Sequence, residues 1–134
     1  MSPRFLLDTH IVVRWLTAPK KLSREQMRVL SDAVHRRELL GVSAITLLEI
    51  ATLFGSGAAR SDIRAGELFG DLESSPAIEI VPFTLDAAAE VAALGPSLRD
   101  PADRAIVATA RVRRLRLLTS DQRIIDSDLV PVVA

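Results

Sequence analysis

The segment Phe5-Leu6-Leu7-Asp8-Thr9-His10 carries the clearest signal for the fold of this chain. Its three consecutive apolar residues are typical of a short strand that is buried on both faces. From Thr9 to Leu16 the apolar spacing is that of a helix, and Pro19 marks its end. A buried strand that leads directly into a helix is the repeating unit of α/β domains with a parallel sheet.

The rest of the chain continues this alternation of short apolar runs with helical patterns. Ser23 and Gln26 have the spacing of a capping box and predict the start of a second helix. Thr84 predicts the N-cap of a later helix, and Gly95 its end. The pattern predicts helices at 9–16, 24–37, 43–54, 62–72, 85–94 and 101–113, and strands at 5–7, 39–43, 78–83, 115–118 and 130–133. We therefore expect one α/β domain over residues 1–134, with a central, mostly parallel sheet flanked by helices.

The composition excludes several classes of protein. The 134 residues include no cysteine, so neither disulfides nor thiolate metal sites are possible. The apolar runs are far shorter than the roughly 20 residues that cross a bilayer, and we expect a cytoplasmic protein with no membrane segment. The 17 basic and 17 acidic residues cancel, which disfavours binding of nucleic acid by bulk charge. Because 49% of the residues are hydrophobic, we expect apolar surface to remain for a partner, most simply in a homodimer.

Two acidic residues follow predicted strands. Asp8 comes directly after Phe5-Leu6-Leu7, and Asp121 comes shortly after Leu118. In open parallel sheets, ligands bind at the carboxyl ends of the strands. Both positions also suit the N-cap of a following helix, so a structural role is the alternative interpretation.

A third acid, Asp103, lies on a predicted helix. It shares one face with Ile106, Val107 and Ala110, which should pack against the sheet. Interaction with the helix dipole explains an acid in the first turn, but not an acid on the core-facing side. We therefore expect this carboxylate close to the core.

A fourth acid, Glu49, lies away from the centre of the apolar face of its predicted helix. A solvated glutamate is the simplest interpretation. The apolar residues Ile45 and Leu53, four residues to either side, favour instead the wall of a cleft or a subunit contact.

Four carboxylates at one edge of a sheet suit a hard divalent cation. Oxygen ligands without cysteine fit Mg²⁺ or Mn²⁺ best, and we expect His10 and His35 to be ordinary surface or helix residues. Such ions bridge to phosphate oxygens and activate water for in-line attack. The acids expected in this site are Asp8, Glu49, Asp103 and Asp121.

Four segments resemble the motifs of the PIN-domain ribonucleases, and in particular those of the VapC toxins of bacterial toxin–antitoxin pairs. The segments are Phe5–His10, Ser43–Ala51, Asp100–Ala110 and Leu117–Asp121. Each motif is weakly specific alone, but the ordered set is specific and spans almost the whole chain.

The resemblance implies an activity, partners and residue roles. It implies cleavage of RNA that depends on Mg²⁺ or Mn²⁺, a homodimer, and inhibition by a cognate antitoxin that covers the site. Thr119 is then the hydroxyl that accompanies the fourth acid, and Thr9 the small polar residue after the first. The acids that the resemblance places at the metal are Asp8, Glu49, Asp103 and Asp121.

Other functions are compatible with parts of the sequence. An inactive relative that only binds a partner would keep the fold, although all four acids are present. A receiver domain would need a lysine where Thr119 stands, and an aspartate-nucleophile phosphatase would need a second acid where His10 stands. A DNA-directed nuclease of the same fold is the nearest alternative to a ribonuclease.

The chain has one basic cluster, formed by Arg111, Arg113, Arg114 and Arg116. Cations at the C-terminus of a helix interact favourably with its dipole. Contact with an RNA backbone is the alternative, functional interpretation. Because aromatic residues make up only 4% of the chain, base stacking is expected to contribute little to RNA binding.

Overall fold

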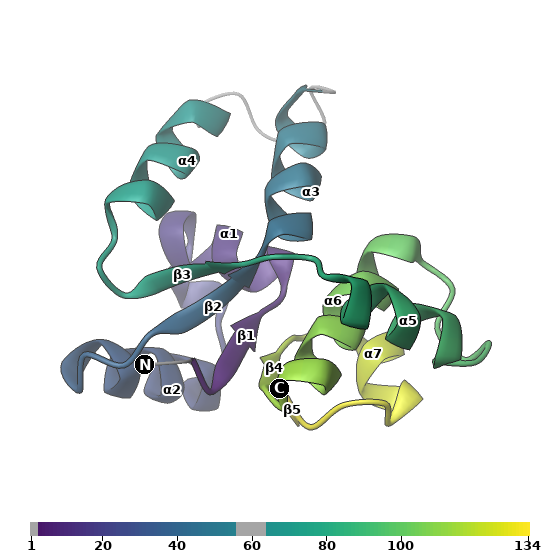
Figure 1. Ribbon diagram of the computed structural model, residues 1–134. Coiled ribbons are helices and arrows are strands. Elements are labelled where there is room, and N and C mark those ends of the chain that lie inside the picture. The colour runs from purple at the N-terminus through teal and green to yellow at the C-terminus, as the bar shows by residue number, and fades with distance from the viewer. Residues whose placement is uncertain (1–2, 56–63) are drawn as a thin grey trace.

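The computed structural model describes residues 3–55 and 64–134. Short strands alternate with helices along the chain, as the sequence predicts (Figure 1). The strands are β1 (Phe5–Leu7), β2 (Leu40–Ser43), β3 (Ile78–Val81), β4 (Arg116–Leu118) and β5 (Val132–Val133). The helices are α1 (Thr9–Thr17), α2 (Arg24–His35), α3 (Ala44–Gly55), α4 (Ala65–Ser74), α5 (Leu85–Ala93), α6 (Pro101–Arg113) and α7 (Gln122–Ser127), with a 3-10 turn η1 (Pro19–Lys21).

The five strands form one sheet in the order β3-β2-β1-β4-β5, and every pair in it is parallel. Leu6 in β1 lies beside Gly41 on one side and Leu117 on the other. The expected single α/β domain with a parallel sheet is therefore confirmed. The first half of the chain adds strands on one side of β1, and the last part adds them on the other side.

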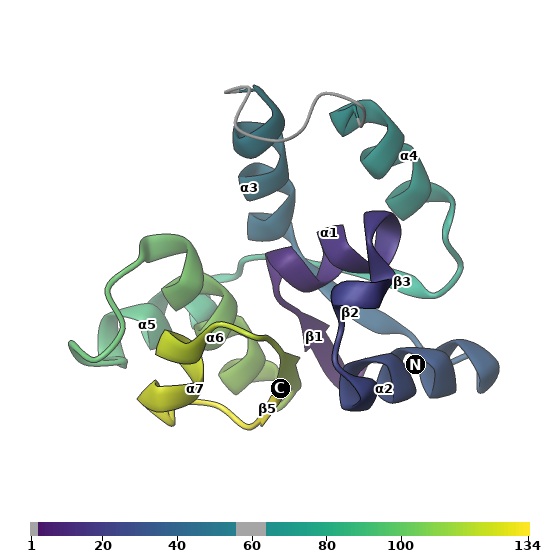
Figure 2. The same ribbon diagram turned by 180° about the vertical axis from the view of Figure 1, so that it is seen from behind.

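Two hydrophobic cores fill the two faces of the sheet, because successive side chains of a strand point to opposite faces. Leu7 belongs to the core on the side of α1, α2, α3 and α4. Leu6 belongs to the core on the side of α5, α6 and α7. Figures 1 and 2 show these two groups of helices on opposite sides of the strands.

Local sequence signals account for most element boundaries. Ser23 and Gln26 form both hydrogen bonds of the predicted capping box at the start of α2. Thr84 caps α5, and Gly95 follows that helix with a φ of 78°, a conformation that favours glycine. The strand predicted at 78–83 ends at Val81, because Pro82 has no N–H for the sheet.

Other boundaries differ from the sequence predictions. The strand predicted at 130–133 covers only Val132–Val133. The helix predicted at 62–72 appears as α4, and its first two predicted residues lie outside the described part of the chain. Helix α7 was not predicted, because its six residues are too few for a clear periodic pattern. Among the described residues, no helix is long and apolar enough to cross a membrane.

Candidate active site

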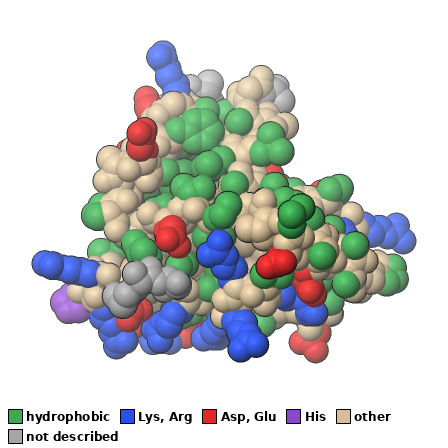
Figure 3. Space-filling view, in the orientation of Figure 1, with side chains coloured by type: hydrophobic (Ala, Val, Ile, Leu, Met, Phe, Trp, Pro, Cys, Tyr) green, Lys and Arg blue, Asp and Glu red, His purple; other side chains and the backbone are tan. Residues whose placement is uncertain are grey.

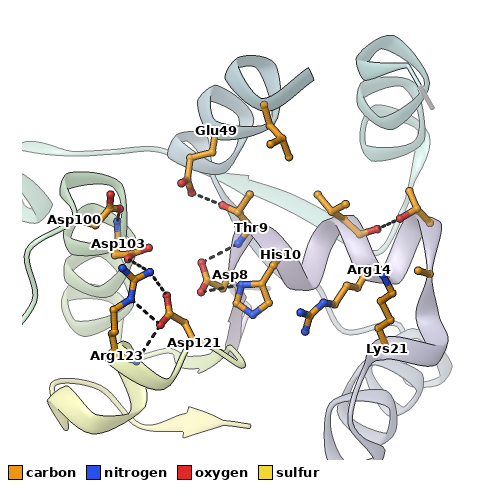
Figure 4. Close-up of a pocket in the computed structure, with 14 residues that line it drawn as sticks. Asp8, Thr9, His10, Arg14, Lys21, Glu49, Asp100, Asp103, Asp121 and Arg123 are labelled. Atoms are coloured by element: carbon orange, nitrogen blue, oxygen red, sulfur yellow. Dashed lines mark hydrogen bonds and ion pairs between the residues drawn. The ribbon is translucent and has the colours of Figure 1, made fainter. Parts of the chain in front are cut away.

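The main pocket opens at the carboxyl ends of β1 and β4. The connections on the two sides of these strands run over opposite faces of the sheet, and such a reversal point is where open α/β sheets bind ligands. The pocket has a volume of about 510 Å³. All four predicted acids line it, together with Asp100. Figure 4 shows these carboxylates reaching the pocket from different elements.

Asp8 lies immediately after β1 and is buried. One of its carboxylate oxygens accepts a hydrogen bond from the Thr9 backbone N–H at 2.8 Å, as expected for the N-cap of α1. The other accepts a hydrogen bond from the hydroxyl of buried Thr119 at 2.7 Å. Asp8 therefore caps a helix and faces the pocket at the same time. A structural role as N-cap and a role in a ligand site are compatible for this residue.

Glu49 lies on α3 and is held by Thr9. The Thr9 hydroxyl donates to the Glu49 carboxylate at 2.5 Å. Since that hydroxyl has one proton, it accepts from Thr46, whose oxygen lies 3.0 Å away. Burial is the main cause of the raised pKa of Glu49, and the hydrogen bond from Thr9 partly opposes it. Glu49 and Leu53 line the pocket together, which agrees with the cleft wall that the sequence favours.

Asp103 lies in the first turn of α6 and is only 8% exposed. Its backbone N–H donates to the Asp100 carboxylate, which caps the helix, at 2.9 Å. Burial, followed by the negative charges of Asp100, Asp8, Asp121 and Glu49, raises the pKa of Asp103 to about 7. This carboxylate therefore has too little positive charge nearby to stabilise its ionised form.

Asp121 caps α7 and is paired with Arg123. The Arg123 guanidinium lies 3.0 Å from an Asp121 oxygen and 3.9 Å from an Asp103 oxygen. The hydrogen bond from Arg123 is the main cause of the lowered pKa of Asp121. One arginine of the protein therefore supplies positive charge to two of the acids.

His10 connects the two strand ends that form the pocket. Its Nε2 accepts a hydrogen bond from the Ser120 backbone N–H at 2.8 Å, so Nε2 carries no proton. Its Nδ1 lies 3.5 Å from Asp8. Burial lowers the pKa of His10, and the charge of Asp8 opposes this effect. Neutral His10 therefore holds the turn after β4 against the start of α1.

The acids have the chemistry that a hard divalent cation needs. Carboxylate oxygens are the ligands that Mg²⁺ and Mn²⁺ prefer. The pKa of Asp103 is raised by burial and then by neighbouring negative charges, which such an ion would neutralise. In the described parts of the chain, no three Asp, Glu, His or Cys side chains are arranged to hold an ion as they stand. Thr119, Thr9 and Arg123 instead bond to the acids. A carboxylate has about four lone-pair sites, so the two threonines can keep these bonds while the acids hold an ion, whereas the positive charge of Arg123 would compete with it.

The basic cluster of residues 111–116 lies elsewhere. It is at the amino end of β4, whereas Asp121 follows the carboxyl end of that strand. Arg111 donates to the Glu90 carboxylate and the Leu129 carbonyl, and Arg116 donates to the Val132 carbonyl. These contacts agree with a structural role, and contact of the cluster with RNA stays a prediction.

Several pocket residues were not singled out by sequence reasoning. Arg14, Lys21 and Arg123 line the pocket but carry no motif signal. Arg14 lies four residues after His10, so helical spacing from His10 is the signal that would have suggested it. Arg123 can be recognised as a pocket residue only when α7 is known, because its side chain returns from that helix to Asp121.

The fold is that of a known family. Residues 5–128 match the PIN domain, and the chain belongs to the PIN domain family. It is a homologue of "Ribonuclease VapC22" of Mycobacterium tuberculosis, with 33% identity over 120 residues that cover 89% of this chain and 88% of the relative.

Two solved structures share the fold over almost their full length. FitAcB from Neisseria gonorrhoeae is 26% identical with a TM-score of 0.71, and the match covers 97% of this chain and 96% of that one. VapBC-5 from Mycobacterium tuberculosis, a member of the VapBC family of toxin-antitoxin systems, is 25% identical with a TM-score of 0.64, and the match covers 98% of both chains.

Proposed function

We propose that this protein is a metal-dependent endoribonuclease, a VapC-type toxin neutralised by a cognate antitoxin. The main support for the proposal is that acidic residues from four parts of the chain line one pocket. The kinship with a protein named a ribonuclease supports RNA as the substrate. The acids proposed to act are Asp8, Glu49, Asp103 and Asp121.

The proposed ion is Mg²⁺ or Mn²⁺, held by these four carboxylates. When bound, it supplies Lewis-acid activation of water and neutralises charge on the phosphate. Thr119 orients Asp8 through a 2.7 Å hydrogen bond, and Thr9 orients Glu49 through a 2.5 Å hydrogen bond. Without an ion, burial and the neighbouring acids raise the pKa of Asp103 to about 7, so binding of a divalent cation is expected to displace a proton from this carboxylate near neutral pH.

The proposed partners are an antitoxin and a second copy of this chain. The solved relative from a toxin-antitoxin family supports the antitoxin. Exposed hydrophobic side chains support the homodimer, since Leu48 on α3 is 63% exposed and Leu85 on α5 is 90% exposed. Figure 3 shows hydrophobic side chains gathered over α3, α4 and α5.

The decisive experiment measures cleavage of structured and single-stranded RNAs by purified protein with Mg²⁺, with Mn²⁺ and with chelator. Asp8→Asn keeps the size of the side chain but removes its charge, and we expect activity to fall by about 100-fold or more. The matched control is Asp71→Asn on the exposed surface of α4, which should keep full activity. Circular dichroism checks that both variants fold.

Four outcomes would overturn the proposal. Cleavage that persists in chelator would exclude the metal mechanism, and an Asp8→Asn protein as active as the native one would exclude the site. Cleavage of DNA in place of RNA would favour the DNA-directed alternative. Antitoxin binding without any cleavage would favour an inactive binding module.

A further inference from the structure

The pocket extends well beyond the acids. Its second half is formed by α1 and η1, which contribute Val13, Arg14, Thr17, Ala18 and Lys21. Figure 4 shows Arg14 and Lys21 on the opposite side of His10 from the acidic residues. The pocket therefore has an acidic half and a basic half, with His10 between them.

Among residues 3–55 and 64–134, the two cations of the basic half have no acidic partner. Within the described residues, neither the Arg14 nor the Lys21 side chain forms an ion pair or a side-chain hydrogen bond. By contrast, the pocket's third cation, Arg123, is paired with Asp121 and lies 3.9 Å from Asp103. Arg14 is also half-buried, so its charge is less well solvated than that of a surface arginine. Unpaired cations in a cleft are suited to an anionic ligand.

We propose that Arg14 and Lys21 bind the phosphodiester backbone of single-stranded RNA, one or more nucleotides away from the bond that is cleaved. This inference rests on the proposed function. The acidic half repels RNA unless a cation is present, whereas the basic half attracts it in either case. Arg14 is one helical turn from His10, a rise of about 6 Å, and Lys21 lies beyond Arg14 on η1, which follows α1. The backbone of the substrate therefore crosses His10 and continues along α1.

The residues that line the basic half favour contact with the RNA backbone over contact with the RNA bases. Apart from its two cations, this half is lined by small or aliphatic side chains and the Thr17 hydroxyl. The Thr17 hydroxyl already donates to the Val13 carbonyl at 2.7 Å. Apart from His10 at the border with the acidic half, the described lining includes no ring on which a base could stack. The basic half should therefore add affinity with little discrimination among bases.

The test compares the double variant Arg14→Gln/Lys21→Gln with a matched control, Lys20→Gln/Arg24→Gln. Each removes one lysine and one arginine charge, and the two control residues are exposed and do not line the pocket. The probe is a fluorescently labelled, single-stranded oligouridylate. Its binding is measured by anisotropy in millimolar Ca²⁺ at several salt concentrations, and its cleavage in Mn²⁺.

We expect the double variant to bind the probe about tenfold more weakly at low salt. The slope of log affinity against log salt should fall by about 1.4, since each contact with a single-stranded phosphate contributes about 0.7. KM should rise while kcat stays within about twofold, because these contacts are made equally before and during the reaction. The single variant Arg14→Lys, which keeps the positive charge, should keep most of the native binding. The control should behave as the native protein.

The outcomes separate this inference from the proposed function. If the native protein cleaves RNA and the double variant binds and cleaves as well as the control, the inference is wrong and the proposed function stands. The double variant would also match the control if the true ligand of the basic half were an acidic protein segment. If the native protein binds RNA without cleaving it and the double variant binds more weakly, the nuclease proposal fails and the inference stands. If the native protein does neither, both are wrong.

Discussion

Asp103 combines burial with the presence of four other carboxylates. A buried carboxylate is stable only when it is paired, hydrogen-bonded or protonated. Its closest cation, Arg123, lies 3.9 Å away and is bound more closely to Asp121. The result is a pKa raised to about 7, so without an ion this residue is expected to reduce the stability of the folded protein near neutral pH.

We expect Asp103→Asn to stabilise the metal-free protein near neutral pH. A carboxyl with a raised pKa has no effect on stability below its unfolded value of about 4, and it destabilises increasingly as the pH rises toward the folded value of about 7. In chelator at about pH 7.5, the variant should melt about 5 °C above the native protein. The difference should vanish toward about pH 4.

Thermal melts with millimolar Mg²⁺ or Mn²⁺ complete this test. An ion that binds only the folded state raises the melting temperature of the native protein, and Asp103→Asn should lose most of that response. Asp71→Asn, with an exposed carboxylate, should match the native protein in every condition. Equal melting of the Asp103→Asn and native proteins near neutral pH would show that Asp103 is not destabilising.

The short helix α7 brings a positive charge to the acidic half of the pocket. Asp121 accepts from the Arg123 backbone N–H at 2.9 Å at the start of the helix, and the Arg123 side chain returns to the same carboxylate. The Arg123 side chain is 75% exposed, so it can leave the acids at little cost. It therefore competes with a divalent ion for Asp121.

We expect Arg123→Gln to bind Mn²⁺ more tightly than the native protein does. Loss of the guanidinium removes the competitor, so the same rise in melting temperature should be reached at an Mn²⁺ concentration at least about threefold lower. Arg99→Gln is the control, because Arg99 is an exposed cation near Asp100 that forms no ion pair in the described structure. Weaker Mn²⁺ binding by Arg123→Gln would mean that Arg123 supports the ion site and does not compete with it.

Exposed hydrophobic residues are concentrated around α3, β3 and α5. In addition to Leu48 and Leu85, Ile80 is 41% exposed and Phe83 is 40% exposed. β3 is an edge strand of the sheet, so its outer side is open to another element. An apolar surface of this kind is typical of a subunit interface.

We expect Leu48→Glu/Leu85→Glu to convert a dimer into a monomer, because two charges would have to be buried without partners. Light scattering after size-exclusion chromatography measures the mass of the particle. Val34→Glu is the control, since Val34 is 49% exposed on α2, away from this surface. A native protein that is already monomeric at high concentration would remove the dimer from the proposed function.

The local pattern of the sequence was enough to predict most elements and their caps. Helix α6 occupies the predicted residues 101–113, and the capping box of α2 and the Thr84 cap form as expected. These features depend on side-chain spacing and on hydrogen bonds between residues close in sequence, so they can be predicted without the fold. For the four acids the local pattern was not enough, because a solvated residue is the simplest interpretation of Glu49, and the resemblance to a known family was needed to place that acid at the metal. Their role in one site stays a prediction.

How these elements pack together depends on contacts between residues that are far apart in the sequence. Thr119 reaches Asp8 across 111 positions of the chain because β4 pairs with β1 and not with β3. Strand order depends on the packing of helices against both faces of the sheet, which no local pattern contains. The same packing brings Arg14, Lys21 and Arg123 into one pocket with the acids, and places the basic cluster of residues 111–116 at the other end of β4.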